Sequence, residues 1–318
     1  MPRQLRIEYE GAIYHVMNRG DRQEDIVQGS ADCELWVKTL GEASAKCNWQ
    51  VHAFCLMSNH FHLVVETPLG NLVSGMKWLL GTYTIRFNAR HRLRGHLFAG
   101  RYKSLVVDDS DNSYFRVACD YVHLNPVRAG LLKPEQGLRE YVWSSYPAYL
   151  SSPAKRPVWL QTDRLLGAHG VGAADRRARL EFARRMETAR QGANDPPASD
   201  ALMRRGWRLG GEDFLARLLD RIEGKPTENH HARERRETAQ AKADRIVAEM
   251  LEAIGWSEAD LTGRPKCAPE KIRIAERLRQ ETDLTLKRVA HRLGMGSWTN
   301  VSKLLYEVRY RKKPHPKD

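Results

Sequence analysis

The sequence predicts an α+β domain followed by an all-α region. Across the first 150 residues, short apolar segments rich in β-branched side chains alternate with longer segments of helical spacing, in the order β-α-β-β-α-β-α. The last fifty residues instead contain three helical segments and a glycine-containing turn. We therefore predict three domains: an α+β domain at residues 1–150, a helical basic linker region at 151–265, and a helix-turn-helix region at 266–318.

Each segment of the first domain has a local signal. Strands are expected where apolar and β-branched side chains concentrate, at residues 11–17, 49–56, 60–67 and 97–107. Helices are expected where apolar side chains recur at helical spacing, at residues 32–47, 71–91 and 113–124. The first six segments match the ferredoxin-like βαββαβ arrangement, an antiparallel sheet with helices on one face, and the last helix is an addition. Because this fold hosts many functions, it does not decide the function.

The C-terminal segments indicate a helix-turn-helix. Helices are expected at residues 269–280, 285–293 and 298–310, and a Gly-Met-Gly turn joins the last two. Such a pair is typical of a helix-turn-helix, although a small helical bundle without a DNA role has the same pattern. The basic tail at residues 309–313 favours DNA.

Charge and cysteine usage narrow the class of protein. The net charge is +13, which suggests a polyanionic partner such as nucleic acid. Residues 1–150 hold 17 Lys and Arg against 15 Asp and Glu, whereas residues 151–318 hold 35 against 24, so the second half is the expected electrostatic anchor. Five cysteines without a Cys-x-x-Cys pair suit a reducing compartment. With no apolar run of membrane length, we expect a cytoplasmic, nucleoid-associated protein without a membrane partner.

Two histidines form one half of a candidate metal site. His60 and His62 open a predicted strand, and residues two apart in a strand point to the same face. Two imidazoles on a rigid element can bind one cation. Histidines so spaced are more often ordinary neighbours, so a second element must converge on them.

The helix expected after the fourth strand offers that second element. Tyr121 and Asn125 are four residues apart, hence on one helical face. Pro126 disfavours helical geometry at Asn125, which places Asn125 at the helix end with its amide oxygen free to bind. Tyr121 then supplies a nucleophilic oxygen and Asn125 a third metal ligand. A core tyrosine with a satisfied hydroxyl is the alternative for Tyr121.

These motifs together resemble a known family. Residues 59–63 read Asn-His-Phe-His-Leu, and residues 120–126 read Asp-Tyr-Val-His-Leu-Asn-Pro. Residues 14–20 read Tyr-His-Val-Met-Asn-Arg-Gly, and residues 98–103 read Phe-Ala-Gly-Arg-Tyr-Lys. Over residues 1–150 the pattern resembles the single-tyrosine HUH transposases of the insertion-sequence type, and among them the REP-associated tyrosine transposases.

The resemblance implies specific roles. His60 and His62 would be the paired metal-binding histidines, Tyr121 the nucleophile, and Asn125 the polar residue that completes the site. The implied metal is Mg²⁺ or Mn²⁺, and the implied partner is single-stranded DNA beside a hairpin of a palindromic repeat. A divalent ion neutralises and orients a phosphodiester, and a phenol needs such a field or a base to attack at neutral pH. The implied product is a 5′-phosphotyrosine, from which DNA can be rejoined.

Other side chains compete for roles or add to them. Tyr114 lies on nearly the same helical face as Tyr121 but lacks an Asn four residues later. Tyr102 is expected in the core or against DNA. His123 is expected to have a structural role. Glu66 lies too far along the strand to reach the ion. The expected DNA contacts are Arg19 and Arg22, whose alternative is a solvated turn, together with Arg101, Lys103, Ser297, Thr299 and Asn300. The last three lie where the sequence resembles the helix-turn-helix of bacterial replication initiators, although residues 296–298 depart from that pattern.

Three functions compete at this stage. The first is an HUH-type tyrosine transposase that cleaves and rejoins single-stranded DNA, and the second is a catalytically idle DNA-hairpin-binding regulator. The third is an RNA-binding protein, ranked last because no RNP-type aromatic signature is present. The set of His60, His62, Tyr121 and Asn125 favours the enzyme. The sequence leaves open the oligomeric state and the palindrome that is recognised.

Overall fold

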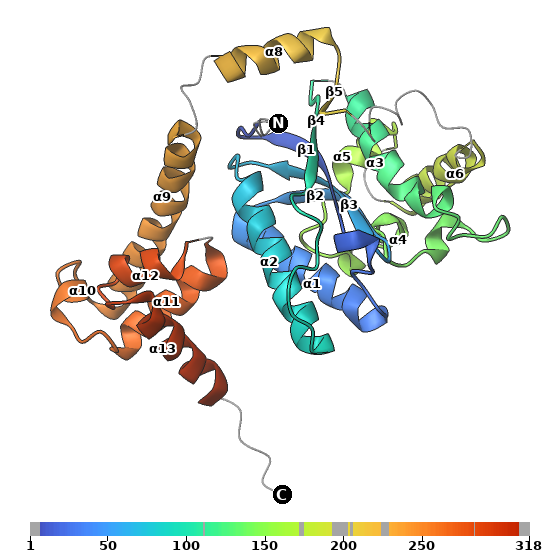
Figure 1. Ribbon diagram of the computed structural model, residues 1–318. Coiled ribbons are helices and arrows are strands. Elements are labelled where there is room, and N and C mark those ends of the chain that lie inside the picture. Colours follow the sequence, from blue (N-terminus) through green and yellow to red (C-terminus); the bar gives the residue numbers. More distant parts are fainter. Residues whose placement is uncertain are drawn as a thin grey trace, which may run out of the picture. The chain divides into compact units, whose positions relative to one another are not determined.

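The computed structural model describes residues 7–110, 112–171, 175–192, 203, 206–223, 229–282 and 284–311, with the backbone alone for residues 222, 223, 229–241 and 309–311. The chain divides into two compact units, Met1–Pro226 and Thr227–Asp318 (Figure 1). The hydrophobic core of the first unit includes side chains as late in the sequence as Leu218, and the second unit has a core of its own. The three-domain division at residues 150 and 265 stays a prediction.

The first unit is built on a five-stranded sheet in the order β2-β3-β1-β4-β5. Its strands are β1 (Ala12–Arg19), β2 (Gln50–Leu56), β3 (His60–Thr67), β4 (Lys103–Val107) and β5 (Arg208–Leu209). Strands β2, β3, β1 and β4 are antiparallel neighbours, and β5 adds a short parallel edge beside β4. This order confirms the predicted ferredoxin-like α+β fold.

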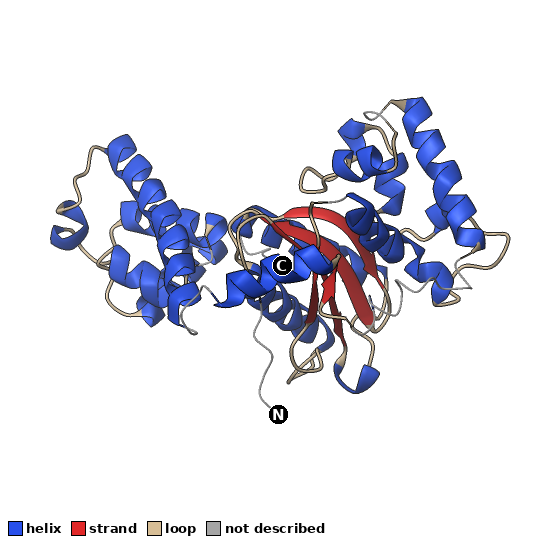
Figure 2. Ribbon diagram, turned by 90° about the horizontal axis from the view of Figure 1, so that it is seen from above, coloured by secondary structure: helices blue, strands red, loops and turns tan. Residues whose placement is uncertain are grey.

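Helices cover both faces of the sheet (Figure 2). On one face lie α1 (Ser30–Cys47) and α2 (Leu72–His91), and Trp36 of α1 packs against Phe61 of β3 with 5.2 Å between ring centroids. Helix α3 (Asn112–Arg128) packs against β2 and β3 from the other side. Because side chains alternate along β3, the neighbours of Phe61 face α3, and this alternation positions the site.

Shorter helices pack around this framework. In the first unit they are α4 (Tyr146–Leu150), α5 (Asp163–Ala168), α6 (Arg176–Gln191) and α8 (Glu212–Glu223), with 3-10 turns at Asp21–Gln23, Leu138–Glu140 and Pro153–Lys155. None of the helices in the described part of the chain is long and apolar enough to cross a membrane.

Two predicted boundaries were wrong. The fourth strand begins at Lys103 rather than at residue 97, because Gly100 adopts φ +56° and interrupts the extended chain. Helix α3 continues through Pro126 to Arg128, whereas the sequence placed its end at Asn125. Proline removes the backbone donor that would reach the Val122 carbonyl oxygen four residues earlier, but residues 121–126 are all buried, so packing holds this stretch in the helix. The side chains of Asn125 and Arg128 donate to the adjacent Tyr121 carbonyl oxygen, at 2.9 and 3.3 Å.

In the described residues of the second unit the regular secondary structure is all helical, as predicted for the C-terminal region. It contains α9 (Asn229–Ile254), α10 (Asp260–Gly263), α11 (Pro269–Glu281), α12 (Leu286–Arg292) and α13 (Trp298–Arg311). Thr285 caps α12 by accepting from the Arg288 amide. Gly294 is required in the following turn because its φ is +59° and a Cβ there would lie 2.5 Å from the Leu261 carbonyl oxygen.

Candidate functional site

The two histidines of β3 lie on the face that α3 covers. His62 is buried at 3% exposure, whereas His60 at the strand start is only partly buried. Their ring centroids are 5.1 Å apart with the planes nearly perpendicular. The alternation that turns Phe61 towards Trp36 therefore brings both imidazoles to the opposite side of the sheet, as the sequence predicted.

Helix α3 carries Tyr121 to the same place. The Tyr121 ring centroid lies 5.7 Å from that of His62, and the side chain is 5% exposed. Asn125, one turn later, lines the same pocket, and its Nδ2 donates to the Tyr121 carbonyl oxygen at 2.9 Å. This bond uses the amide nitrogen and leaves Oδ1 as the atom of Asn125 that can bind a cation. Asn125 therefore reaches the site from inside the helix, not from its end.

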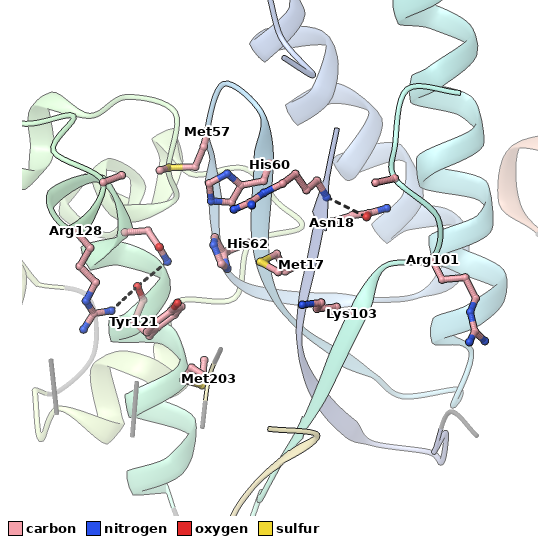
Figure 3. A pocket seen from close by; sticks show the side chains of 14 residues that line it. Met17, Asn18, Met57, His60, His62, Arg101, Lys103, Tyr121, Arg128 and Met203 are labelled. Carbon is pink, nitrogen blue, oxygen red and sulfur yellow. Dashed lines mark hydrogen bonds between the residues drawn. The ribbon is translucent and has the colours of Figure 1, made fainter. Parts of the chain in front are cut away.

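One pocket of about 570 Å³ unites the four predicted site residues (Figure 3). Its basic lining residues are Arg19, Arg101, Lys103 and Arg128. Three of these four were expected to contact DNA, and Arg128 was not considered. Arg22, also expected to contact DNA, lies in the exposed turn after β1 and is not among the pocket residues. The pocket thus combines two imidazoles, a phenol and an amide with a positive border.

Burial keeps the histidines neutral. Desolvation and the charge of Arg19 lower the pKa of His60 to about 4. Desolvation, followed by the effects of His15, His60, Arg19 and Arg128, lowers the pKa of His62 well below its usual value. A neutral imidazole has a lone pair for a metal, whereas a protonated one has none. Both side chains are therefore in the ligand form at physiological pH.

The donor set fits a divalent cation that also binds substrate. Two imidazole nitrogens and one amide oxygen would leave further positions for phosphate oxygens and water. The amide, phosphate and water oxygens are ligands that suit Mg²⁺ and Mn²⁺. Within the described residues, no group of three or more His, Cys, Asp or Glu side chains could hold a metal. A site here would therefore depend on Asn125 and on the substrate.

The structure adds two residues that sequence reasoning missed. His15 of β1 lies beside His62, with 2.9 Å between His15 Nε2 and His62 Nδ1. Arg128 lies over the Tyr121 ring, 4.7 Å from its centroid. His15 belongs to the motif at residues 14–20 that contributes to the family resemblance, but the sequence suggested no role for this residue. Arg128 follows Tyr121 by seven residues, the spacing of one helical face, and this was the available signal.

The competing candidates lie elsewhere. The Tyr114 hydroxyl is near Gly211, outside the pocket, and Tyr102 is buried at 7% exposure. Glu66 accepts a hydrogen bond from His52 Nε2 at 3.2 Å and forms an ion pair with Arg164. His123 is buried and shares a hydrogen bond of 2.8 Å with Ser145 Oγ.

In the second unit, the three predicted DNA contacts lie at the start of α13. Ser297 Oγ accepts from the Asn300 amide at 3.2 Å and lies 2.6 Å from Thr299 Oγ1. Asn300 Nδ2 donates to the Met295 carbonyl oxygen. These bonds stabilise the turn, while Trp298 and Tyr306 are exposed at 54% and 61%. The predicted basic tail lies outside the residues whose side chains the structure describes.

One family model matches the N-terminal part of the chain. Residues 8–125 match the family model described as an IS200-like transposase. The match contains strands β1 to β4 and all four predicted site residues of the pocket. This part of the chain is therefore similar to the IS200-like transposases.

Among solved structures, the chain is similar to one described as a REP-associated tyrosine transposase bound to a REP hairpin. The sequence identity is 13%, the TM-score is 0.41, and the likeness covers 51% of this chain and 92% of that chain. No curated protein matches the chain.

Proposed function

We propose that this protein is a metal-dependent, HUH-type tyrosine transposase that cleaves and rejoins single-stranded DNA next to palindromic repeat hairpins. The observation that carries the proposal is the meeting of His60, His62, Tyr121 and Asn125 in one pocket. These residues come from β3 and α3, and His62 and Tyr121 are 59 positions apart in the sequence. A nucleophile beside a set of metal ligands is the arrangement that phosphodiester transfer needs.

His60, His62 and Asn125 would hold Mg²⁺ or Mn²⁺ through two imidazole nitrogens and one amide oxygen. When bound, such an ion neutralises and orients the scissile phosphate. All three ligands are uncharged, so the protein would bind the ion weakly on its own and more tightly once the phosphate adds negative charge. Coupling metal binding to substrate in this way would restrict cleavage to bound DNA.

Tyr121 would attack the phosphorus. A bond forms between Tyr121 Oη and phosphorus, the bond from phosphorus to the 3′ oxygen breaks, the phenol loses its proton and the 3′ oxygen gains one. The products are a 5′-phosphotyrosine and a free 3′-hydroxyl. Because the phosphodiester bond is exchanged and not hydrolysed, the reverse reaction can rejoin DNA without ATP.

The basic border of the pocket would hold the strand. Three basic side chains lie on or beside the end of β1 and the start of β4, namely Arg19, Arg101 and Lys103. They line the same pocket as the two histidines. Phosphate contacts from Arg and Lys fix the position of a nucleic acid without reading its sequence. Recognition of a hairpin would therefore need further contacts, and the helical second unit would bind duplex DNA nearby as a tether. Such a protein would act at the nucleoid.

A covalent-adduct assay tests the proposal. A 5′-labelled strand would leave its label on the free 3′-hydroxyl product, so the single-stranded hairpin oligonucleotide should be labelled on the 3′ side of the cleavage site. With Mn²⁺, we expect a labelled protein band on a denaturing gel that disappears with EDTA and in Tyr121→Phe. Tyr114→Phe is the matched control and should retain the band.

The same assay separates the main alternative. A catalytically idle hairpin-binding regulator would retain the hairpin in a native gel with or without EDTA and would form no adduct under any condition. Absence of an adduct from a set of palindromic hairpins to which the protein binds tightly would overturn the proposed catalysis.

A further inference from the structure

Both candidate ligand histidines have one ring nitrogen occupied by a neighbour. His60 Nδ1 lies 2.7 Å from Asn59 Oδ1, and His62 Nδ1 lies 2.9 Å from His15 Nε2. In each ring, only Nε2 is then left to bind a cation. A neutral imidazole has one proton, so Nε2 can be a ligand only when that proton is on Nδ1. What each neighbour accepts or donates therefore decides whether the histidine can bind metal.

The neighbour of His60 leaves no choice of tautomer. Asn59 Nδ2 donates to the Gln23 carbonyl oxygen at 3.2 Å, which fixes the amide with its nitrogen towards Gln23 and its oxygen towards His60. An amide oxygen only accepts hydrogen bonds. The proton must therefore be on His60 Nδ1, and the lone pair on His60 Nε2.

The neighbour of His62 allows two arrangements. His15 Nε2 can donate to His62 Nδ1, which leaves the proton of His62 on Nε2 and blocks metal binding. Alternatively, His62 Nδ1 donates to His15 Nε2, which frees the lone pair on His62 Nε2. The two ring planes are parallel to within 3°, and the two nitrogens are much closer, at 2.9 Å, than the ring centroids, at 5.1 Å, so the rings meet through these nitrogens. Both side chains are at most 4% exposed. Water therefore cannot easily replace either partner.

The sheet holds His15 in this position. His15 lies on β1 opposite Val64, while His62 lies on β3 opposite Met17, so the two histidines are diagonal neighbours on one face. Cross-strand neighbours in an antiparallel pair keep a fixed register. The contact is thus set by the pairing of two central strands, not by a mobile loop.

We propose that His15 is a positioning residue that accepts a hydrogen bond from His62 Nδ1 and so directs His62 Nε2 towards a divalent cation, as Asn59 does for His60. From the proposed function, this inference takes only that a divalent cation binds at the site. Partners of this kind orient metal-binding histidines in many proteins, and their loss typically weakens metal affinity about 10- to 100-fold.

The first test reads the tautomers without metal, DNA or activity. The full chain would be labelled with ¹⁵N at histidine, and long-range ¹H–¹⁵N correlations would be recorded in a metal-free buffer. We expect both His60 and His62 in the Nδ1–H form, and we expect His62 to lose this preference in His15→Met. His15→Gln should retain it because a carboxamide oxygen can accept at nearly the same place. His123, bonded to Ser145, should not change in any variant.

The second test measures the dissociation constant for Mn²⁺ by electron paramagnetic resonance. His15→Met should weaken Mn²⁺ binding by about 10- to 100-fold, and His15→Gln should restore much of the loss. Met and Gln have similar volumes, so a role in packing alone would make the Met variant at least as good as the Gln variant. If His15→Met does not fold, Asn59→Leu and Asn59→Asp provide the same comparison at a partly exposed position.

The outcomes separate this inference from the proposed function. An Nε2–H tautomer at His62 in the wild-type protein would overturn the inference, and so would equal Mn²⁺ affinity in the Met and Gln variants. Tautomers as expected, with an active Tyr121 but no effect of His15→Met on metal affinity, would also reject it. Tautomers as expected without any adduct would reject the catalytic proposal and leave the role of His15 in place.

Discussion

Arg128 lies directly against Tyr121. Its guanidinium carbon is 4.7 Å from the centroid of the phenol ring, and its Nη1 donates to the Tyr121 carbonyl oxygen at 3.3 Å. Both residues belong to α3, and both line the pocket that contains His60 and His62. A cation over an aromatic face is attracted by the ring quadrupole, so the contact fixes the ring and places positive charge beside the proposed nucleophile.

Replacing Arg128 should therefore slow adduct formation. We expect Arg128→Met, which keeps most of the aliphatic length, to lower the rate about 10- to 100-fold, the effect of losing roughly 1–3 kcal/mol of interaction with a charged group. The rate in Arg128→Lys should lie between the rates of the wild type and Arg128→Met. The measurement is the single-turnover rate of the labelled adduct at saturating Mn²⁺. A rate in Arg128→Met equal to that of the wild type would show that the guanidinium has no part in the reaction.

Gly20 controls the turn that supports Asn59. Its amide donates to the Asn59 carbonyl oxygen at 2.8 Å, and a Cβ there would lie 2.0 Å from the Glu24 carbonyl oxygen. Two and three residues later in the same turn, Arg22 and Gln23 have φ values of +52° and +67°. The backbone of this turn has little freedom to move away from an added methyl group.

We expect Gly20→Ala to lower the free energy of unfolding by about 1–3 kcal/mol, the usual cost of an overpacked site, and to weaken Mn²⁺ binding by displacing Asn59. Gly81→Ala in α2 is the matched control, because a Cβ there meets no atom within 4 Å. Alanine in that helix should raise stability by about 0.5–1 kcal/mol. Urea unfolding of both variants gives the comparison, and a neutral Gly20→Ala would contradict the geometry.

Buried histidines make stability depend on pH. Burial lowers the pKa of His15 to about 4, and burial followed by the charge of His169 lowers that of His123 to about 3. Unfolding returns each group to about 6.5. Between these pKa values the unfolded chain binds more protons than the folded one. The contribution of the neutral histidines to the free energy of unfolding is therefore fully present above pH 6.5 and is lost as the pH falls.

We therefore expect the urea concentration at the midpoint of unfolding to decrease as the pH is lowered from 6.5 to 5. This pH range lies above the one in which most carboxylates titrate. His123→Gln should make this decline shallower, because one buried group no longer takes up a proton on unfolding. The experiment uses metal-free buffer so that metal release does not contribute. A midpoint that stays constant from pH 6.5 to 5 would mean that these imidazoles are not held neutral by burial.

The sequence by itself determined the elements and most of the candidate site. Alternation in β3 places His60 and His62 on one face whatever packs above them, and the four-residue spacing in α3 does the same for Tyr121 and Asn125. These are local periodicities, so they can be read without knowledge of the fold. The ferredoxin-like order followed from the succession of strand and helix signals.

Only the tertiary structure decided which side chains support that site. His15 reaches His62 through the register of β1 against β3, and register depends on pairing between segments distant in the sequence. The continuation of α3 through Pro126 is likewise a tertiary outcome, because residues 121–126 are all buried in the packed first unit. Local propensity predicted an end to the helix there, because a proline weighs against it until this packing is known.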